Sequence, residues 1–201
     1  VPAFKGYRGY PATLCTSVND VIVHGIPNGK TRLREGDLLS VDCGVLLEGY
    51  YGDAAVTFGV GAVSAEAQRL VAVTRACLDE AVATVAPDAR LGDVGAAVQR
   101  RAEAAGFGVV REFVGHGIGR SLHEEPQVPN YGKAGQGQRL MPGLVIAIEP
   151  MITGGSWRVV IDDDGWTART EDGKLAAHFE GAVAVTADGR RVLGLGGFMN
   201  A

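Results

Sequence analysis

The sequence has few cysteines and no long apolar run, and each shortage excludes a class of protein. Three cysteines cannot form a disulfide framework, and no Cys-x-x-Cys pair gives the spacing of a thiolate zinc site. No stretch reaches the roughly 18 consecutive apolar residues of a membrane helix, and the first residues lack the pattern of a secretory signal. We therefore expect a soluble protein of a reducing compartment, the cytoplasm, without membrane contact.

An excess of positive charge is also absent. The formal net charge of -4 and the pI near 5.6 give no electrostatic reason to expect a nucleic-acid site. With 201 residues, 46% of them hydrophobic, the chain is long enough for one domain with a substantial core. We expect a single catalytic domain over residues 1–201. Because residue 1 is Val and not an initiator Met, we also expect this domain to begin inside a longer protein.

The order of apolar and turn residues predicts an α+β fold, with helices packed against an antiparallel sheet. Apolar residues spaced by three and four predict helices at 64–86 and 93–105, with Ser64 as the cap of the first and Gly106 ending the second. The residues between 38 and 58 read as a hairpin. The expected strands are 14–18, 38–46, 50–58, 109–114, 145–148, 156–160, 165–169 and 177–185.

Four carboxylates and one imidazole stand in or next to these strands, where apolar side chains are expected. They are Asp42, Asp53, His116, Glu149 and Glu180. In the hairpin, a turn centred between Leu47 and Glu48 sets Asp42 opposite Asp53, and a turn one residue later makes them diagonal neighbours. Both registers keep the two carboxylates on one face, where they repel unless a cation lies between them.

Each of these residues also has a simpler interpretation. An Asp or Glu at a strand end is commonly just exposed, and a lone core histidine is commonly satisfied by a backbone carbonyl. Against this, His116 is surrounded by glycines that allow close backbone approach to a bound group. No Gly-Lys-Ser or Gly-Lys-Thr follows them, which excludes a nucleotide-binding loop. The joint occurrence of all five favours a metal site.

Charge and ligand type specify the metal site further. Four carboxylates leave a large negative excess around one divalent ion, whereas two ions neutralise them, so we expect a dinuclear centre. Oxygen ligands with one nitrogen and no thiolate favour Mn, Fe(II) or Co over structural zinc. Two such ions activate a shared water and stabilise a developing oxyanion, which predicts a hydrolase.

Several motifs make the chain resemble type I methionine aminopeptidases between about Tyr7 and Gly189. The motifs are Ser17-Val18-Asn19-Asp20, His24-Gly25-Ile26-Pro27, Gly115-His116-Gly117-Ile118-Gly119, His123-Glu124-Glu125-Pro126 and Ile148-Glu149-Pro150-Met151. The resemblance implies the pseudo-symmetric pita-bread fold, a curved antiparallel sheet with helices on its outer face. Members of the family carry two further helices before the region of Tyr7. We expect this chain to lack them and to expose apolar sheet surface.

The resemblance also implies a role for each site residue. Asp42 would bind one metal ion, Asp53 and Glu180 would bridge both, and His116 and Glu149 would bind the other. Glu149 would also handle protons, and His123 and His24 would contact the substrate and assist catalysis. The pocket for the methionine side chain would consist of Tyr7, Tyr10, Cys15, Leu122 and Trp166. One departure is Gly181, which stands where the family usually has a histidine and so removes a group near the metal ions.

The implied activity is removal of the initiator methionine from nascent polypeptides, with a small second residue preferred. The enzyme would be a cytoplasmic monomer that meets its substrates at the ribosome. Two alternatives remain open from the sequence. One is a proline-directed peptidase of the same fold, and the other is a relative that binds peptides or proteins without catalysis.

Overall fold

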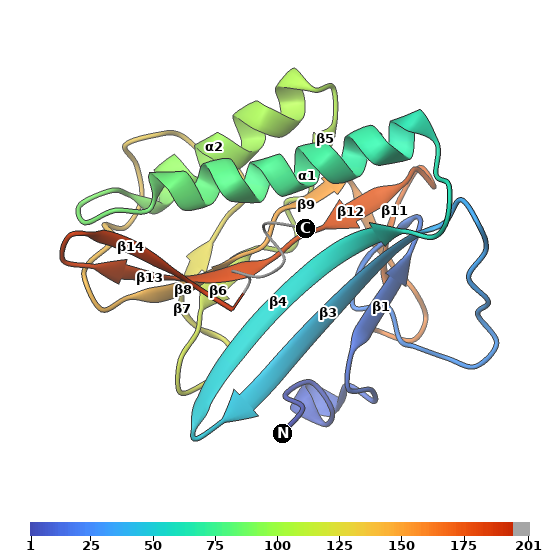
Figure 1. Cartoon of the computed structure of the whole chain (residues 1–201), viewed down its shortest axis with the longest axis horizontal. Helices are drawn as coiled ribbons and strands as arrows, with labels where there is room; N and C mark the ends of the chain where they lie inside the picture. The colour runs from blue at the N-terminus through green and yellow to red at the C-terminus, as the bar shows by residue number, and fades with distance from the viewer. Residues whose placement is uncertain (195–201) are drawn as a thin grey trace.

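The fold consists mainly of short antiparallel strands, with two helices lying together on one side of them (Figure 1). The structure is a computed structural model that describes residues 1–194. The strands are β1 (Cys15–Val18), β2 (Val21–Val23), β3 (Leu38–Leu47), β4 (Tyr50–Gly59), β5 (Gly108–Val109), β6 (Gly115–Gly117), β7 (Glu124–Val128), β8 (Val145–Ile148), β9 (Met151–Thr153), β10 (Val159–Ile161), β11 (Ala168–Thr170), β12 (Ala176–His178), β13 (Gly181–Thr186) and β14 (Gly189–Leu193). The helices are α1 (Ala65–Thr84) and α2 (Leu91–Ala104), and a 3-10 turn, η1, spans Tyr7–Gly9. In this part of the chain, neither helix is long and apolar enough to cross a membrane.

Both predicted helices are present, and their ends follow the capping chemistry. The Ser64 hydroxyl accepts a hydrogen bond of 3.1 Å from the Ala67 N–H, as expected for the first residue before α1. Helix α2 begins at Leu91, two residues before the predicted start. The Asp93 carboxylate accepts the Arg90 N–H at 2.7 Å, so Asp93 lies in the first turn and caps it. Gly106, with a φ of 79°, follows the end of α2.

Strands β3 and β4 form the predicted hairpin, and its register is the diagonal one. Glu48 and Gly49 have φ values of 51° and 83°, which suit a tight two-residue turn. Asp42 therefore pairs with Ala55, and Gly44 pairs with Asp53. The opposite face of the hairpin is apolar and open, as expected from the sequence: Val45, Leu47 and Phe58 are 43%, 69% and 45% exposed.

A second antiparallel ladder joins β8 and β9 to β12 and β13 in one continuous register. Ile148 pairs with Gly181, and Met151 pairs with His178 on the other side of Pro150. Pro150 therefore does not interrupt the strand pairing. Pro150 lacks a donor, but its carbonyl still accepts the Phe179 N–H at 3.3 Å. The predicted strand 177–185 is accordingly split into β12 and β13.

Other strand limits also differ from the prediction. Strands β2, β6, β7, β9 and β14 were not predicted, and the predicted strand 109–114 shrinks to β5. The predicted strands 156–160 and 165–169 begin three residues later, as β10 and β11. For β11 the cause is Asp164, whose Oδ1 accepts the N–H groups of Trp166 and Thr167 at 2.8 Å and so holds these residues in a turn.

The main core lies between the helices and the second ladder. Leu70 and Leu78 of α1 and Val98 of α2 are fully buried in the same cluster as Ile146 and Ile148 of β8. This packing holds β8 and β13 against the helices. The packing thereby also positions Glu149, which follows β8, and Glu180, which precedes β13.

Candidate metal centre

Asp42 and Asp53 lie on the inner face of the β3–β4 hairpin and are both buried. Their exposed fractions are 7% and 8%. Burial, together with the neighbouring Asp53 and Glu149, raises the pKa of Asp42 well above its ordinary value. Burial also raises the pKa of Asp53, to about 7. The two carboxylates are thus unfavourable as a pair of bare anions at neutral pH.

Glu149 and Glu180 form a matching pair in the second ladder. Because Ile148 pairs with Gly181, the next residue along each chain, Glu149 and Glu180, stand opposite one another. Burial first, and then the neighbouring carboxylates, raise the pKa of both glutamates well above the ordinary value. The backbone of Glu180 also pairs with Ala55 of β4, its N–H donating at 2.9 Å, which joins this ladder to the aspartate hairpin.

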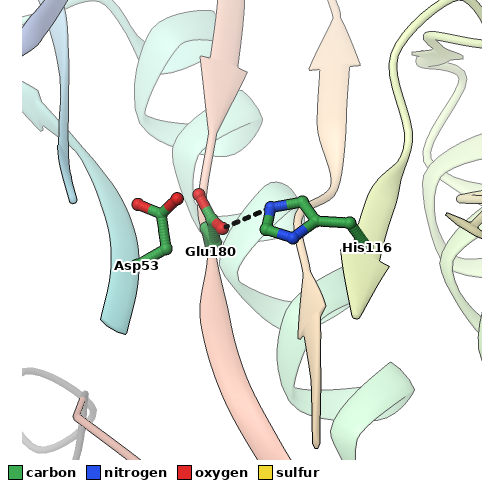
Figure 2. A group of neighbouring side chains, drawn as sticks. All are labelled: Asp53, His116 and Glu180. Atoms are coloured by element: carbon green, nitrogen blue, oxygen red, sulfur yellow. Dashed lines mark ion pairs between the residues drawn. The ribbon is translucent and has the colours of Figure 1, made fainter. Parts of the chain in front are cut away.

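His116 reaches the carboxylates from β6 (Figure 2). Figure 2 shows Asp53, Glu180 and His116 on three separate chain segments with their side chains pointing toward one another. The His116 Nδ1 lies 2.9 Å from the Gly117 carbonyl oxygen, so Nδ1 carries the proton and Nε2 faces the acids. Its Nε2 is 3.6 Å from Glu149 Oε1 and 3.9 Å from Glu180 Oε1. This is the orientation of a metal-binding imidazole.

The glycines beside His116 have a packing role in the sheet. A Cβ at Gly115 would lie 2.3 Å from the Ala147 carbonyl oxygen, and one at Gly117 would lie 2.3 Å from the Glu125 carbonyl oxygen. These glycines therefore allow β6 to lie close to its neighbours β8 and β7. They fix the position of His116 through strand packing.

The residues brought together fit a pair of divalent cations. Asp42 Oδ1 and Glu180 Oε1 are buried atoms without a hydrogen-bond partner among the described residues. Ligand atoms of Asp53, His116 and Glu180 all lie within 4.8 Å of one another. Buried acceptor oxygens that lack donors are costly unless a cation satisfies them. The structure thus brings all five predicted ligands to one place, and their binding of metal stays a prediction.

A cavity of about 150 Å³ opens beside these carboxylates. Every residue predicted for the site lines it: His24, His123, Tyr7, Tyr10, Cys15, Leu122, Trp166, Asp42, Asp53, His116, Glu149 and Glu180. Tyr10 and Trp166 pack edge to face with ring centroids 5.1 Å apart, which gives one wall an apolar surface. A larger hollow of about 650 Å³, between residues 26–33 and 162–169, contains none of the histidines or predicted ligands.

Two histidines besides His116 line the cavity next to the carboxylates. The His123 Nδ1 lies 2.8 Å from the Tyr7 hydroxyl, and the two rings stack. Burial, with a contribution from His116, lowers the pKa of His123 to about 4. Burial lowers the pKa of His24 to about 4 as well. Both rings are therefore neutral at physiological pH and can offer one N–H donor each.

Sequence reasoning missed a fourth histidine at the site. His178 is 1% exposed, and its Nε2 lies 3.9 Å from Glu149 Oε2 and 3.8 Å from Glu180 Oε2. In the sequence it looks like an ordinary core residue of an apolar strand. The available signal was its position two residues before Glu180, because alternate residues of a strand face the same side.

The family of the chain follows from comparison with known proteins. Residues 3–187 match metallopeptidase family M24. The chain is a member of the M24 family. This agrees with the collection of buried acids and imidazoles, because an M24 metallopeptidase depends on a divalent metal ion for peptide hydrolysis.

Relatives within the M24 family are similar over nearly the whole chain. A methionine aminopeptidase A from Synechocystis sp. is 54% identical, with 98% of this chain and 78% of the relative covered. A methionine aminopeptidase from Clostridium perfringens is 51% identical, covering 96% and 78%. The crystal structure of a methionine aminopeptidase from Thermotoga maritima is 50% identical and superposes with a TM-score of 0.94 over 96% of this chain and 77% of that one. The expected α+β, pita-bread fold is confirmed by this likeness.

Proposed function

We propose that this M24 member is a dinuclear metalloaminopeptidase that removes the initiator methionine from nascent polypeptides and prefers a small second residue. The observation that supports this function is that five candidate metal ligands line the same cavity as an aromatic wall. A cavity of about 150 Å³ can hold an apolar group as large as benzene. Aromatic faces and the Cys15 thiol suit a thioether, which gains sulfur–aromatic contact as well as burial. The names of the relatives point to the same substrate.

We assign the ligands as the resemblance implies. Asp42 would hold one ion, His116 and Glu149 the other, and Asp53 and Glu180 would bridge them. Two divalent ions bound there, Mn, Fe(II) or Co, would activate a water and stabilise the negative charge that develops on the scissile carbonyl oxygen. Two ions also match the charge of the four carboxylates.

The remaining side chains would orient the substrate and move protons. Glu149 lines the cavity, where its carboxylate can take a proton from the attacking water and pass it to the leaving amine. The His123 Nδ1 lies 2.8 Å from the Tyr7 hydroxyl, and we assign the hydroxyl as the donor; the ring proton would then lie on Nε2 and be offered to the substrate carbonyl. His24 would contact the peptide beyond the first residue, and Leu122 would close the methionine pocket.

The cellular setting belongs to the same proposal. A single catalytic domain that acts on new N-termini would work in the cytoplasm, as a monomer, close to the ribosome. The acidic chain offers no evident surface for direct binding to nucleic acid.

A peptide assay after chelation and reloading with Mn, Co or Fe(II) tests the function. The reloaded protein should release methionine from Met-Ala-Ser and leave Ala-Pro substrates uncut. Asp42→Asn and Glu180→Gln, which keep shape but remove a charge, should lower kcat/KM by at least about 100-fold. Asp88→Asn, at an exposed carboxylate 73% accessible, is the matched control and should act like the parent. Full methionine release by both site variants would contradict the proposal.

A further inference from the structure

His178 is held rigidly on the face of the ladder that carries the acids. The Thr57 hydroxyl contacts both the N–H and the carbonyl oxygen of His178 at 2.8 Å, and these residues are 121 positions apart. In the ladder His178 pairs with Met151, and Glu180 stands opposite Glu149. The four side chains share one face, because they alternate with residues that point the other way. His178 therefore stands diagonally across from Glu149.

The His178 ring lacks, at Nε2, the hydrogen bond that a buried ring nitrogen normally has. Its Nε2 is fully buried and has no hydrogen-bond partner among the described residues. The nearest acceptors, Glu149 Oε2 and Glu180 Oε2, are 3.9 and 3.8 Å away, which is too far for a hydrogen bond. A buried ring nitrogen close to two carboxylates, and bonded to neither, is costly unless a further partner, such as a bound cation, satisfies it.

The spacing around this nitrogen matches ligands of one metal ion. Bonds of about 2.0–2.2 Å place neighbouring ligand atoms roughly 3–4 Å apart. The ligand atoms of Glu149, His178 and Glu180 all lie within 4.8 Å of one another. His116 faces the other oxygen of each of the same two glutamates, at 3.6 and 3.9 Å. The two imidazoles thus flank the Glu149–Glu180 pair from opposite oxygens.

We propose that His178 is an additional metal ligand, so that two imidazoles and four carboxylates bind the metal ions of this protein. The inference rests on the proposed dinuclear centre and adds to it a ligand that the predicted set of five lacks. A second nitrogen ligand makes the site softer and favours Co, Fe(II) or Zn over Mn. It also gives one ion an additional protein ligand.

Proton NMR of the Co(II)-loaded protein tests the proposal without relying on activity. A histidine bound through Nε2 shows its exchangeable Nδ1–H as a strongly shifted signal, one for each bound ring. The parent protein should show two such signals, and His178→Gln and His116→Gln should each show one. The control, His24→Gln, changes a histidine of the same cavity that contacts no carboxylate in the proposed ligand set, and it should keep both signals.

Calorimetry with Co(II) gives the second measurement. His178→Gln should weaken the binding of one ion by about 10–100-fold, with unfolding in chelator unchanged. A single shifted signal in the parent protein overturns the proposal, even if His178→Gln binds metal weakly or fails to fold. If calorimetry shows two bound ions and NMR shows only one bound imidazole, only the role of His178 is refuted. If the parent protein binds no ion, the dinuclear centre is refuted as well.

Discussion

Thr57→Val should destabilise the fold strongly, although the two side chains have nearly the same shape. The Thr57 hydroxyl donates to the His178 carbonyl and accepts the His178 N–H, both at 2.8 Å. Its single proton goes to that carbonyl, so the Ser40 hydroxyl, 2.7 Å away, must donate to it. All of these groups are buried. Valine leaves three polar groups without this partner: the Ser40 hydroxyl, the His178 N–H and the His178 carbonyl oxygen.

Each orphaned group costs about 1–3 kcal/mol, so the loss should be roughly 3–6 kcal/mol after partial relaxation. Thr57→Ser keeps the hydroxyl and removes one methyl, which costs about 1 kcal/mol. Urea unfolding in chelator, followed by the fluorescence of Trp157 and Trp166, measures both variants at equal m-value. The expected gap between Val and Ser is at least about 2 kcal/mol. Equal losses would refute the assignment of Thr57 as a hydrogen-bonding link.

Three further predictions concern the acids, the thiols and helix packing. Bound Co(II) or Mn should raise the Tm more at pH 7.5 than at pH 5.5, seen by calorimetry. Burial raises the pKa of Asp53 to about 7, so the metal-free fold loses stability as the pH rises from about 4 to 7, and metal removes that loss. DTNB should label only the exposed Cys43 in the native protein, because burial raises the pKa of Cys15 and Cys77 to about 12. In urea it should label all three thiols. Gly95→Ala should lower the urea midpoint despite a helix-propensity gain of about 1 kcal/mol, because its Cβ would lie 2.3 Å from the Tyr131 carbonyl oxygen. A higher midpoint, or rapid labelling of a second thiol, would contradict these packing assignments.

The local features of the fold could be predicted because they depend on period and turn chemistry. Alternation over β3 and β4 placed Asp42 and Asp53 on one face in either register, and the Glu48–Gly49 turn then selected the diagonal one. Helical spacing gave α1 and α2. The start of α2 was missed by two residues because Asp93 caps the helix from inside its first turn.

Contacts between distant segments could not be predicted, because no local pattern encodes them. A proline commonly ends strand pairing, yet the ladder continues past Pro150 with the loss of a single donor. Nothing in the spacing of Ala55 and Glu180 indicates that their backbones pair. The five ligands were identified by chemical type and family resemblance, and His178 was missed because an apolar strand provides a sufficient explanation for a buried ring.

The site depends most on one junction between the two ladders. Ala55 pairs with Glu180, and two residues further on, the Thr57 hydroxyl takes the place of a strand partner for His178. This junction therefore sets the distance between Asp53, on β4, and the acids of the second ladder. If it governs ligand geometry, Thr57→Val should weaken Co(II) binding under conditions where the variant is still folded, while Thr57→Ser should bind as the parent does. Equal affinities for Val and Ser would mean that the metal ions, and not the backbone junction, draw the two ladders together.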